Sequence, residues 1–250
     1  QAVVPDIFED VEEYTEALSL TRMSYELEGL LSPVFAAVLL GVIGFDVLFA
    51  LNGVAFLLSA FLISTTAVPR LTRDVDLSAH RFRQLTRGVR HYLRVPRLRG
   101  LFAVYFAAAA ASAMVIINTV VFVKGEFGLS DNEVAWALGA VGAGSITVAV
   151  AMPRLLRRVR DYTVMMAGGA VLTVMLVLVS GVGSLLPLVV AWFAIGTGLS
   201  LVQTPAGRLI QRSAGSDDRP ALYAAQFSLS HFCWLITYPL AGFIGAGIGL

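Results

Sequence analysis

Long apolar runs without a single charged residue dominate this chain. Residues 101–123 form an uncharged run of 23 residues, 134–152 form one of 19, and 162–207 hold 46 residues without a charge. The hydrocarbon core of a bilayer is about 30 Å thick, and about 20 helical residues cross it. Only 14% of the residues are charged, against about 25% in soluble domains. The sequence therefore predicts an all-α fold, a polytopic bundle of membrane-spanning helices. A soluble helical protein, whose helices carry a polar face, does not fit.

Glycine, proline and isolated charges divide the longer runs. The run 162–207 breaks at 181–187, Gly-Val-Gly-Ser-Leu-Leu-Pro, where glycine and proline permit a tight turn. Residues 29–69 carry one charge, Asp46, and divide there. The seven predicted spans lie near residues 19–43, 46–68, 99–123, 134–156, 162–182, 185–207 and 222–248. Glycines inside the spans predict close helix contacts, namely Gly139, Gly142, Gly144, Gly196 and Gly198.

The arginines give these spans an orientation. Sixteen of the eighteen basic residues fall in alternate loops. They are Arg70, Arg73, Arg81, Arg83, Arg87, Arg90, Arg94, Arg97, Arg99, Arg154, Arg157, Arg158, Arg160, Arg208, Arg212 and Arg219. Cytoplasmic loops carry the excess of Lys and Arg, so these loops and the N-terminal end of the sequence are expected in the cytoplasm. Only one basic residue, Lys124, is a lysine, a bias typical of a GC-rich bacterium. We expect a multi-pass protein of the bacterial cell (inner) membrane, in contact with the lipid bilayer.

The longest basic loop has the pattern of an amphipathic helix. Phe82, Leu85, Val89 and Leu93 fall close to one helical face, and arginines occupy the rest. A basic amphipathic helix on an anionic membrane surface explains this pattern. Nucleic-acid binding explains it less well, because the loop is tethered to spans at both ends, and no nucleic acid is expected as a partner.

The first and last spans share a proline-centred pattern. Aligning Pro33 with Pro239 also aligns Ala36 with Gly242, at an offset of 206 residues (239 minus 33). The two spans are either unrelated proline-containing helices or copies in a six-span repeat. Parallel six-span repeats are one known plan of secondary transporters.

Two motifs resemble those of the major facilitator superfamily. Ser32-Pro33 followed by Ala36-Ala37 is similar to the Gly-Pro-x-x-Gly-Gly motif of proton-coupled antiporters. The stretch 153–158, Pro-Arg-Leu-Leu-Arg-Arg, resembles the superfamily's Gly-x-x-x-Asp-Arg-x-Gly-Arg-Arg loop, although Arg157 stands where the aspartate would be. Within the superfamily, the chain looks most like bacterial exporters of the siderophore-export and metal-resistance kind.

This resemblance implies a domain organisation and a function. Residues 1–69 would be helices five and six of twelve, 70–98 a basic cytoplasmic linker with an amphipathic helix, and 99–250 helices seven to eleven. The sequence would then be a fragment that needs the missing helices of the full-length chain. The implied function is secondary transport, with proton-coupled efflux of a drug, siderophore or metal-related solute by alternating access. The resemblance also implies roles for two sets of residues. The cytoplasmic gating loop would hold Arg154, Arg157 and Arg158, and the helix-packing motif would hold Ser32, Pro33, Ala36, Ala37, Pro239 and Gly242.

Ionisable groups on the spans are the candidates for proton coupling. Ionisable residues inside a membrane are costly and usually face a cavity or a partner. Arg22 and Glu26 are spaced i, i+4 and can pair on one helical face, either within the transport pathway or at headgroup level. Glu28 lies deeper but on a different face. His231, on the last span, can titrate near neutral pH or can instead be hydrogen-bonded between helices.

Five further residues are candidates for the substrate cavity together with Arg22. Asn118, Gln203 and Gln226 are polar groups on apolar spans that require a partner, either another helix or a substrate. Trp234 and Tyr238 share a face and could stack on an aromatic or cationic ligand, or pack against lipid. No metal site is expected, because His231 and Cys233 are spaced i, i+2 and point to different faces.

Other function classes fit less well. A seven-helix receptor or sensor, or a non-transporting membrane scaffold, remains the alternative to a transporter. The predicted cytoplasmic N-terminal end argues against a receptor, and Lys124, the one lysine, lies in an outer loop, where it cannot hold retinal. The sequence lacks Gly-x-Ser-x-Gly, His-Glu-x-x-His and Gly-x-x-x-x-Gly-Lys motifs. We therefore expect no enzyme activity, no catalytic residues and no cofactor, and we expect an ion gradient to supply the energy.

Overall fold

The computed structural model describes residues 13, 15–21, 23–24, 27–28, 39, 43–65, 81–213, 215 and 218–248. Within these residues the chain forms helices and no strand, which confirms the predicted all-α fold. The named helices are α3 (Phe45–Thr65), α4 (Arg81–Arg94), α5 (Pro96–Val120), the π-helix η1 (Val121–Glu126), α6 (Asp131–Arg158), α7 (Asp161–Val179), α8 (Leu185–Gln203), α9 (Ala206–Ser213) and α10 (Arg219–Ile248).

Six stretches of the described residues are long and apolar enough to cross a membrane. They are Asp46–Thr65, Pro96–Glu126, Asp131–Arg158, Asp161–Val179, Leu185–Ser213 and Arg219–Ile244. These six correspond to six of the seven predicted spans. The other predicted span, near 19–43, lies mostly outside the described residues, and so do Ser32, Pro33, Ala36 and Ala37.

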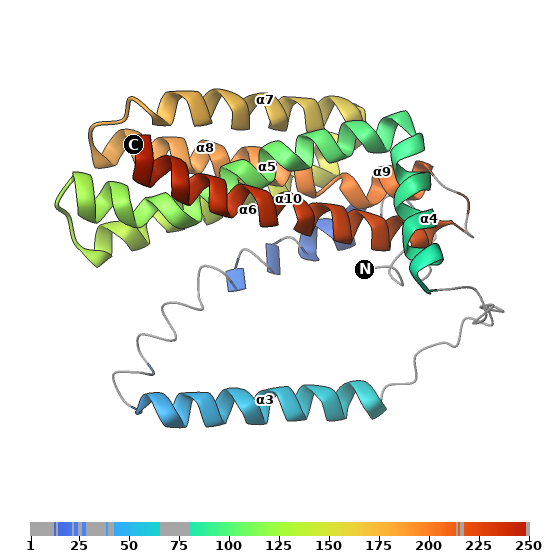
Figure 1. Cartoon of the computed structure of the whole chain (residues 1–250), viewed down its shortest axis with the longest axis horizontal. Coiled ribbons are helices and arrows are strands. Elements are labelled where there is room, and N and C mark those ends of the chain that lie inside the picture. The colour runs from blue at the N-terminus through green and yellow to red at the C-terminus, as the bar shows by residue number, and fades with distance from the viewer. Residues whose placement is uncertain are drawn as a thin grey trace.

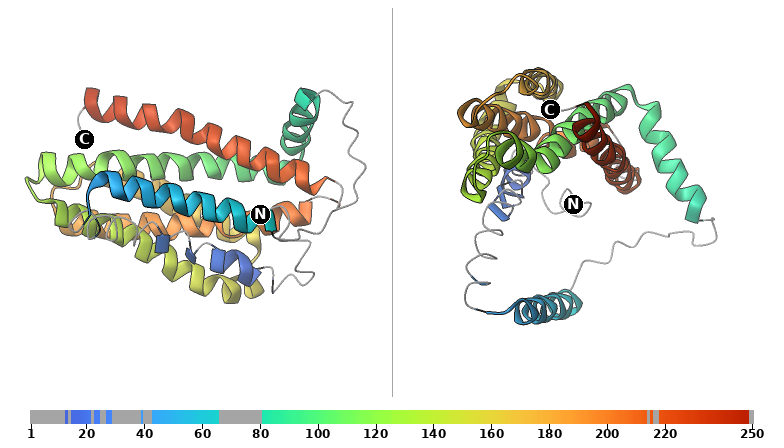
Figure 2. Two further views of the ribbon diagram at one scale, coloured as in Figure 1. Left: turned by 90° about the horizontal axis from the view of Figure 1, so that it is seen from below. Right: turned by 60° about the vertical axis from the view of Figure 1, so that its left-hand side comes forward.

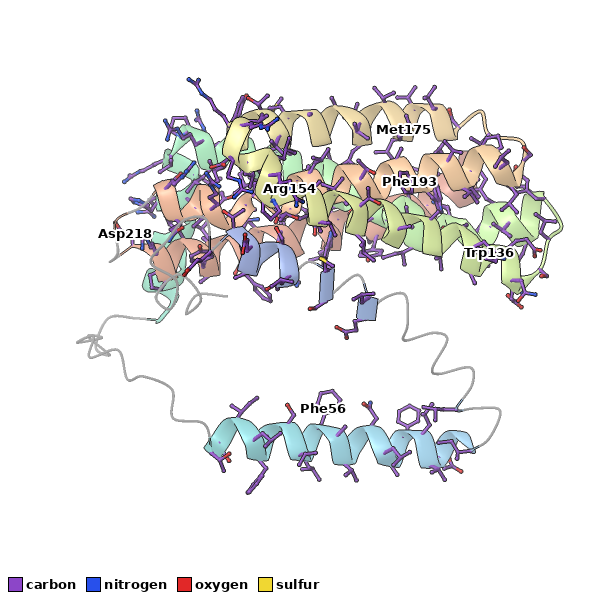
Figure 3. The ribbon with its side chains drawn as sticks, turned by 180° about the vertical axis from the view of Figure 1, so that it is seen from behind. Phe56, Trp136, Arg154, Met175, Phe193 and Asp218 are labelled. Atoms are coloured by element: carbon purple, nitrogen blue, oxygen red, sulfur yellow. The ribbon has the colours of Figure 1, made fainter. Side chains whose placement is uncertain are left out.

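Helices α5 to α8 and α10 run side by side along the length of the bundle, while α4 runs crosswise at one end (Figure 1). The chain reverses direction at each loop, so the starts of α5, α7 and α10, the end of α6, and α9 all lie at that same end. We call this the basic end, because the described arginines of the three predicted loops, from Arg81 onward, lie there. Figure 3 shows Asp218 at this end and Trp136 at the opposite end. The alternation of the arginine-rich loops thus matches the packing of the helices.

Glycine lets α6 and α8 approach each other closely. A Cβ atom built on Gly196 would lie 1.9 Å from the backbone oxygen of Val141, and one on Gly144 would lie 2.0 Å from that of Phe193. Neither position can hold any other residue without moving a backbone. In a bilayer, where apolar side chains gain little from leaving lipid, such close packing is a main source of helix association. The predicted helix contacts of Gly144 and Gly196 are therefore confirmed.

One polar contact lies inside the core of α5, η1, α6, α7 and α8. Trp192 and Thr119 are fully buried, and the Trp192 Nε1–H donates to Thr119 Oγ1 at 2.7 Å. Thr119 in turn donates to the backbone oxygen of Val115 on its own helix. The ring of Phe122 meets that of Trp192 edge-on at 6.2 Å between centroids. These contacts hold α8 against α5. They also provide hydrogen-bond partners for a hydroxyl and an indole N–H, for which lipid chains offer none.

Helix α3 differs from the other spans, because it lies apart from the bundle (Figures 1 and 2). Its side chains from 46 to 65 are exposed, apart from the half-buried Leu48. Phe56, labelled in Figure 3, is 70% exposed. A helix that is apolar all round is suited to lipid or to contact with other spans.

Candidate functional site

A group of ionised side chains lies at the basic end, with Asp161 and Arg208 buried and Arg212 exposed. Asp161, the first residue of α7, is only 5% exposed. Its Oδ2 accepts a hydrogen bond from Arg212 Nη1 at 2.9 Å. Its Oδ1 lies 3.2 Å from Arg208 Nε, an ion pair without hydrogen-bond geometry. The position is favourable for a carboxylate, because the N-terminal end of a helix carries a partial positive charge.

The same group of residues connects α9 to the N-terminal part of the chain. Arg208 is 8% exposed, and its Nη1 donates to Thr15 Oγ1 at 3.1 Å. Thr15 is 2% exposed and belongs to the helical residues 15–21. We call Thr15, Asp161, Arg208 and Arg212 the Asp161 cluster. It joins residues 193 positions apart in the sequence through a polar contact.

Sequence reasoning did not select any residue of the Asp161 cluster. One signal could have found it, because Asp161 is the one acidic residue between Glu133 and Asp217, and it directly follows an arginine-rich stretch. An acid in such surroundings is expected to have a cationic partner. Which arginines serve as partners could not be read, since they lie 47 and 51 residues further along (208 and 212 minus 161).

The three arginines of the predicted gating loop lie on the surface near this cluster. Arg154, Arg157 and Arg158, all on the last turns of α6, are exposed. Arg157 also makes an interaction of its own. The contacts described for the Asp161 cluster involve Thr15, Arg208 and Arg212, and the gating role of the three α6 arginines stays a prediction.

Gln226, one of the predicted cavity residues, contacts another helix. Its Oε1 accepts a hydrogen bond from the hydroxyl of Tyr92, which is fully buried on α4. Burial raises the pKa of Tyr92, and the neighbouring Tyr105 and Cys233 act in the same direction. The hydroxyl therefore stays protonated and remains a donor. Of the two alternatives for Gln226, the structure thus shows contact with another helix.

His231 lies on an exposed face of α10 between two aromatic rings. Its Nδ1 is 2.8 Å from the backbone oxygen of Phe227. The imidazole centroid is 4.0 Å from the ring of Phe227 and 5.3 Å from that of Trp234. Trp234 and Tyr238 are half-buried. The sequence predicted His231, Trp234 and Tyr238 as separate candidates, and the structure places His231 and Trp234 in contact.

The remaining candidates do not gather at one place in the described residues. Asn118 is 2% exposed, and its Nδ2 lies 3.0 Å from Met114 Sδ on the same helix, a weak acceptor. Gln203 is half-buried and engaged in an interaction. Glu28 is exposed, and Arg22 and Glu26 lie outside the described residues.

Two last predictions concern packing and metal binding. Pro239 is exposed. A Cβ atom built on Gly242 would have no neighbouring heavy atom of the described residues within 4 Å. The packing role of these two residues stays a prediction. No three His, Cys, Asp or Glu side chains of the described residues come together as a metal site would require.

The fold and this site define a multi-pass membrane protein, built from antiparallel spans with one strongly basic end. The sequence profile of the Major Facilitator Superfamily matches residues 1–248, and the chain belongs to that family. The resemblance found in the motifs is thereby confirmed. No curated protein and no solved structure matches the chain. Membership makes the protein a membrane secondary transporter of a small-molecule substrate.

Proposed function

We propose that this transporter is a proton-coupled exporter of a small molecule that works by alternating access. In this proposal, residues 1–69 belong to one six-helix half and 99–250 to the other, with 70–98 as the linker. The basic end faces the cytoplasm, because cytoplasmic loops carry the excess of arginine, and the membrane is the bacterial inner membrane. The spans near 19–43 and α10 are then equivalent helices of the two halves.

The Asp161 cluster is the observation that supports alternating access best. The contact between Arg208 and Thr15 joins the two proposed halves at their cytoplasmic end, and it is polar. Charged groups at the end of a span can be rehydrated when the contact opens, whereas buried apolar faces cannot separate as cheaply. We propose that this cluster closes the cytoplasmic side and breaks when that side opens.

Proton coupling is assigned to ionisable groups away from the Asp161 cluster. Asp161 pairs with two guanidinium groups, those of Arg208 and Arg212, and we assign it to the contact that closes the cytoplasmic side. His231 is exposed on α10, and Glu28 is exposed near the N-terminal part. We propose that protons are carried by His231 together with Glu26 or Glu28.

The aromatic surroundings of His231 suggest the kind of substrate. Phe227 is 65% exposed and Trp234 is half-buried, and both rings contact the His231 imidazole, so we propose that these rings contact a solute that approaches α10. Such rings bind cations and flat aromatic groups. Among drugs, siderophores and metal-related solutes, this favours a substrate with an aromatic or cationic part.

A proton-flux assay tests the proposal. Full-length protein is reconstituted into liposomes with an internal pH dye, and candidate solutes are added on one side. An exporter should release protons in exchange for solute, and Glu26→Gln, Glu28→Gln and His231→Ala should identify the coupling groups by losing that exchange. Glu126→Gln is the matched control, because this carboxylate is exposed at the end opposite to the basic end.

The alternatives give different results in the same assay. A receptor, sensor or scaffold would bind solute without moving protons or solute. If solute flux is unaffected by a pH gradient and by all three variants, the protein is a transporter, and the proposal of proton coupling is wrong.

A further inference from the structure

Helix α4 presents two opposite faces, of which one is fixed to the protein. Tyr92 is fully buried, and a Cβ atom built on Gly88 would lie 2.8 Å from the backbone oxygen of Ala221 on α10. Gly88 and Tyr92 are spaced i, i+4 and therefore share a face. Tyr92 donates its hydroxyl hydrogen to Gln226 of α10. Helix α4 is thus docked on α10 through this face, which could not be expected from the apolar pattern alone.

The predicted apolar face of α4 is only partly used in this docking. Val89 packs against the core cluster around Tyr92, whereas Leu93 is 39% exposed. The predicted helix therefore exists, and protein contacts the face that was expected to meet lipid at Val89.

The other face of α4 is cationic. Arg90 and Arg94 are exposed and spaced i, i+4. At 100° per residue, each lies about 200° around the helix from Tyr92. The spacing continues to Arg83 and Arg87 in the sequence, whose side chains lie outside the described residues. Because Tyr92 is fixed on α10, this cationic face has a fixed direction.

The position of α4 matches the level of lipid headgroups. A single extended residue, Val95, separates its last turn from Pro96, where the membrane-spanning stretch Pro96–Glu126 begins. Helix α4 also runs crosswise to the spans (Figures 1 and 2). It therefore lies along the membrane surface at the start of α5. The exposed Leu93 and Arg97 lie beside this junction.

From these observations we propose that the exposed face of α4 is a binding site for anionic phospholipid headgroups, centred on Arg90 and Arg94. Guanidinium groups bind phosphate oxygens in pairs, and juxtamembrane arginines are attracted to anionic lipids. The exposed Leu93 contacts the acyl region next to the headgroup. Headgroup binding on this face stabilises the contact between α4 and α10, because the opposite face carries the Tyr92 to Gln226 hydrogen bond. The site is independent of the transported solute.

A lipid titration tests the site directly. Purified full-length protein in detergent is titrated with short-chain phosphatidylglycerol or phosphatidylcholine, and bound lipid is counted by native mass spectrometry. The wild type should bind phosphatidylglycerol preferentially. Each arginine near an anionic headgroup contributes about a fivefold gain in affinity, so R90Q/R94Q should weaken binding roughly 20-fold. The matched control R154Q/R158Q removes two exposed arginines at the same end and should leave binding nearly unchanged.

Three outcomes of this titration would overturn the proposal. Equal losses in both double variants would mean that the overall charge of the basic end attracts lipid. Equal binding of phosphatidylcholine would remove the role of headgroup charge. Displacement of phosphatidylglycerol by inorganic phosphate or by an acidic peptide would show that the face takes a soluble anion or a protein partner instead.

Hydrogen exchange tests the effect on α10. In the wild type, phosphatidylglycerol should slow amide exchange both in α4 and over residues 219–226. In R90Q/R94Q, the slowing should disappear from both segments. Slowing confined to α4 would refute the stabilisation of the α4–α10 contact.

Discussion

The two ends of the bundle are held together by different kinds of contact. Around Trp192, helices α5 to α8 pack through small and apolar residues, with close backbone approaches at Gly144 and Gly196. At the basic end, the Asp161 cluster and the Tyr92 to Gln226 hydrogen bond join α4, α7, α9, α10 and the segment 15–21. Close apolar packing tolerates little movement. Polar contacts at the end of a span can be exchanged for water. The comparison indicates a rigid body with a separable end, which is what the proposed alternating access requires.

The largest expected effect is at the crossing of α6 and α8. Gly196→Ala places a Cβ 1.9 Å from the backbone oxygen of Val141, so the two helices must separate. We expect the free energy of unfolding to fall by about 3 kcal/mol or more, measured by unfolding in mixed detergent micelles. Gly53→Ala is the matched control, because the space around Gly53 on α3 is open. An equal response of the two variants would mean that the crossing is not closely packed.

The next effect concerns the Asp161 cluster. Asp161→Asn removes the carboxylate that neutralises Arg208 and Arg212 while keeping its size. Arg208 is buried, but the Arg212 side chain is 46% exposed. We therefore expect the free energy of unfolding to fall by about 2 kcal/mol, which is less than the full cost of an unpaired buried charge. The same unfolding assay at low and high salt measures it. A wild-type-like stability for this variant would show that the ion pairs do not hold the basic end together.

A smaller effect is expected inside the core. Thr119→Val removes the acceptor of the Trp192 indole and keeps the side-chain volume. The loss should be about 1 kcal/mol, typical of a hydrogen bond between membrane helices. A double-mutant cycle with Trp192→Phe isolates this contact, and a coupling energy of zero would contradict the hydrogen bond at 2.7 Å.

The smallest effect is expected at the end opposite to the basic end. Lys124 Nζ and Asp131 Oδ1 are 2.8 Å apart, but their side chains are 45% and 86% exposed. Because solvent screens this ion pair, Lys124→Met should lower the free energy of unfolding by about 0.5 kcal/mol or less. A larger loss in the unfolding assay would mean that ion pairs stabilise both ends, and the contrast between the two ends would disappear.

The sequence predicted the parts of the fold that depend on local pattern. Span positions follow from uncharged runs, and the close contacts of Gly144 and Gly196 follow from glycine within such runs. The partners of Tyr92 and Arg208 could not be predicted, because Gln226 lies 134 residues from Tyr92 and Thr15 lies 193 residues from Arg208. From the sequence, several arginines were equally suitable partners for Asp161. Only the packing of the helices brings Arg208 and Arg212 to this carboxylate. The docking of α4 was hidden because Gly88 carries no side chain to mark a buried face.

Distances between spin labels test the contrast between the two ends most directly. One pair is placed at the basic end, at the exposed Glu16 and Gly215, and the other at the opposite end, at Trp136 and Leu186, each 73% exposed. The buried Cys233 is replaced by alanine in all variants. In lipid nanodiscs, Asp161→Asn should add a longer distance to the Glu16–Gly215 pair and leave the Trp136–Leu186 pair with one unchanged distance. A Glu16–Gly215 distance that does not respond to Asp161→Asn would contradict the proposal that the basic end is the separable one.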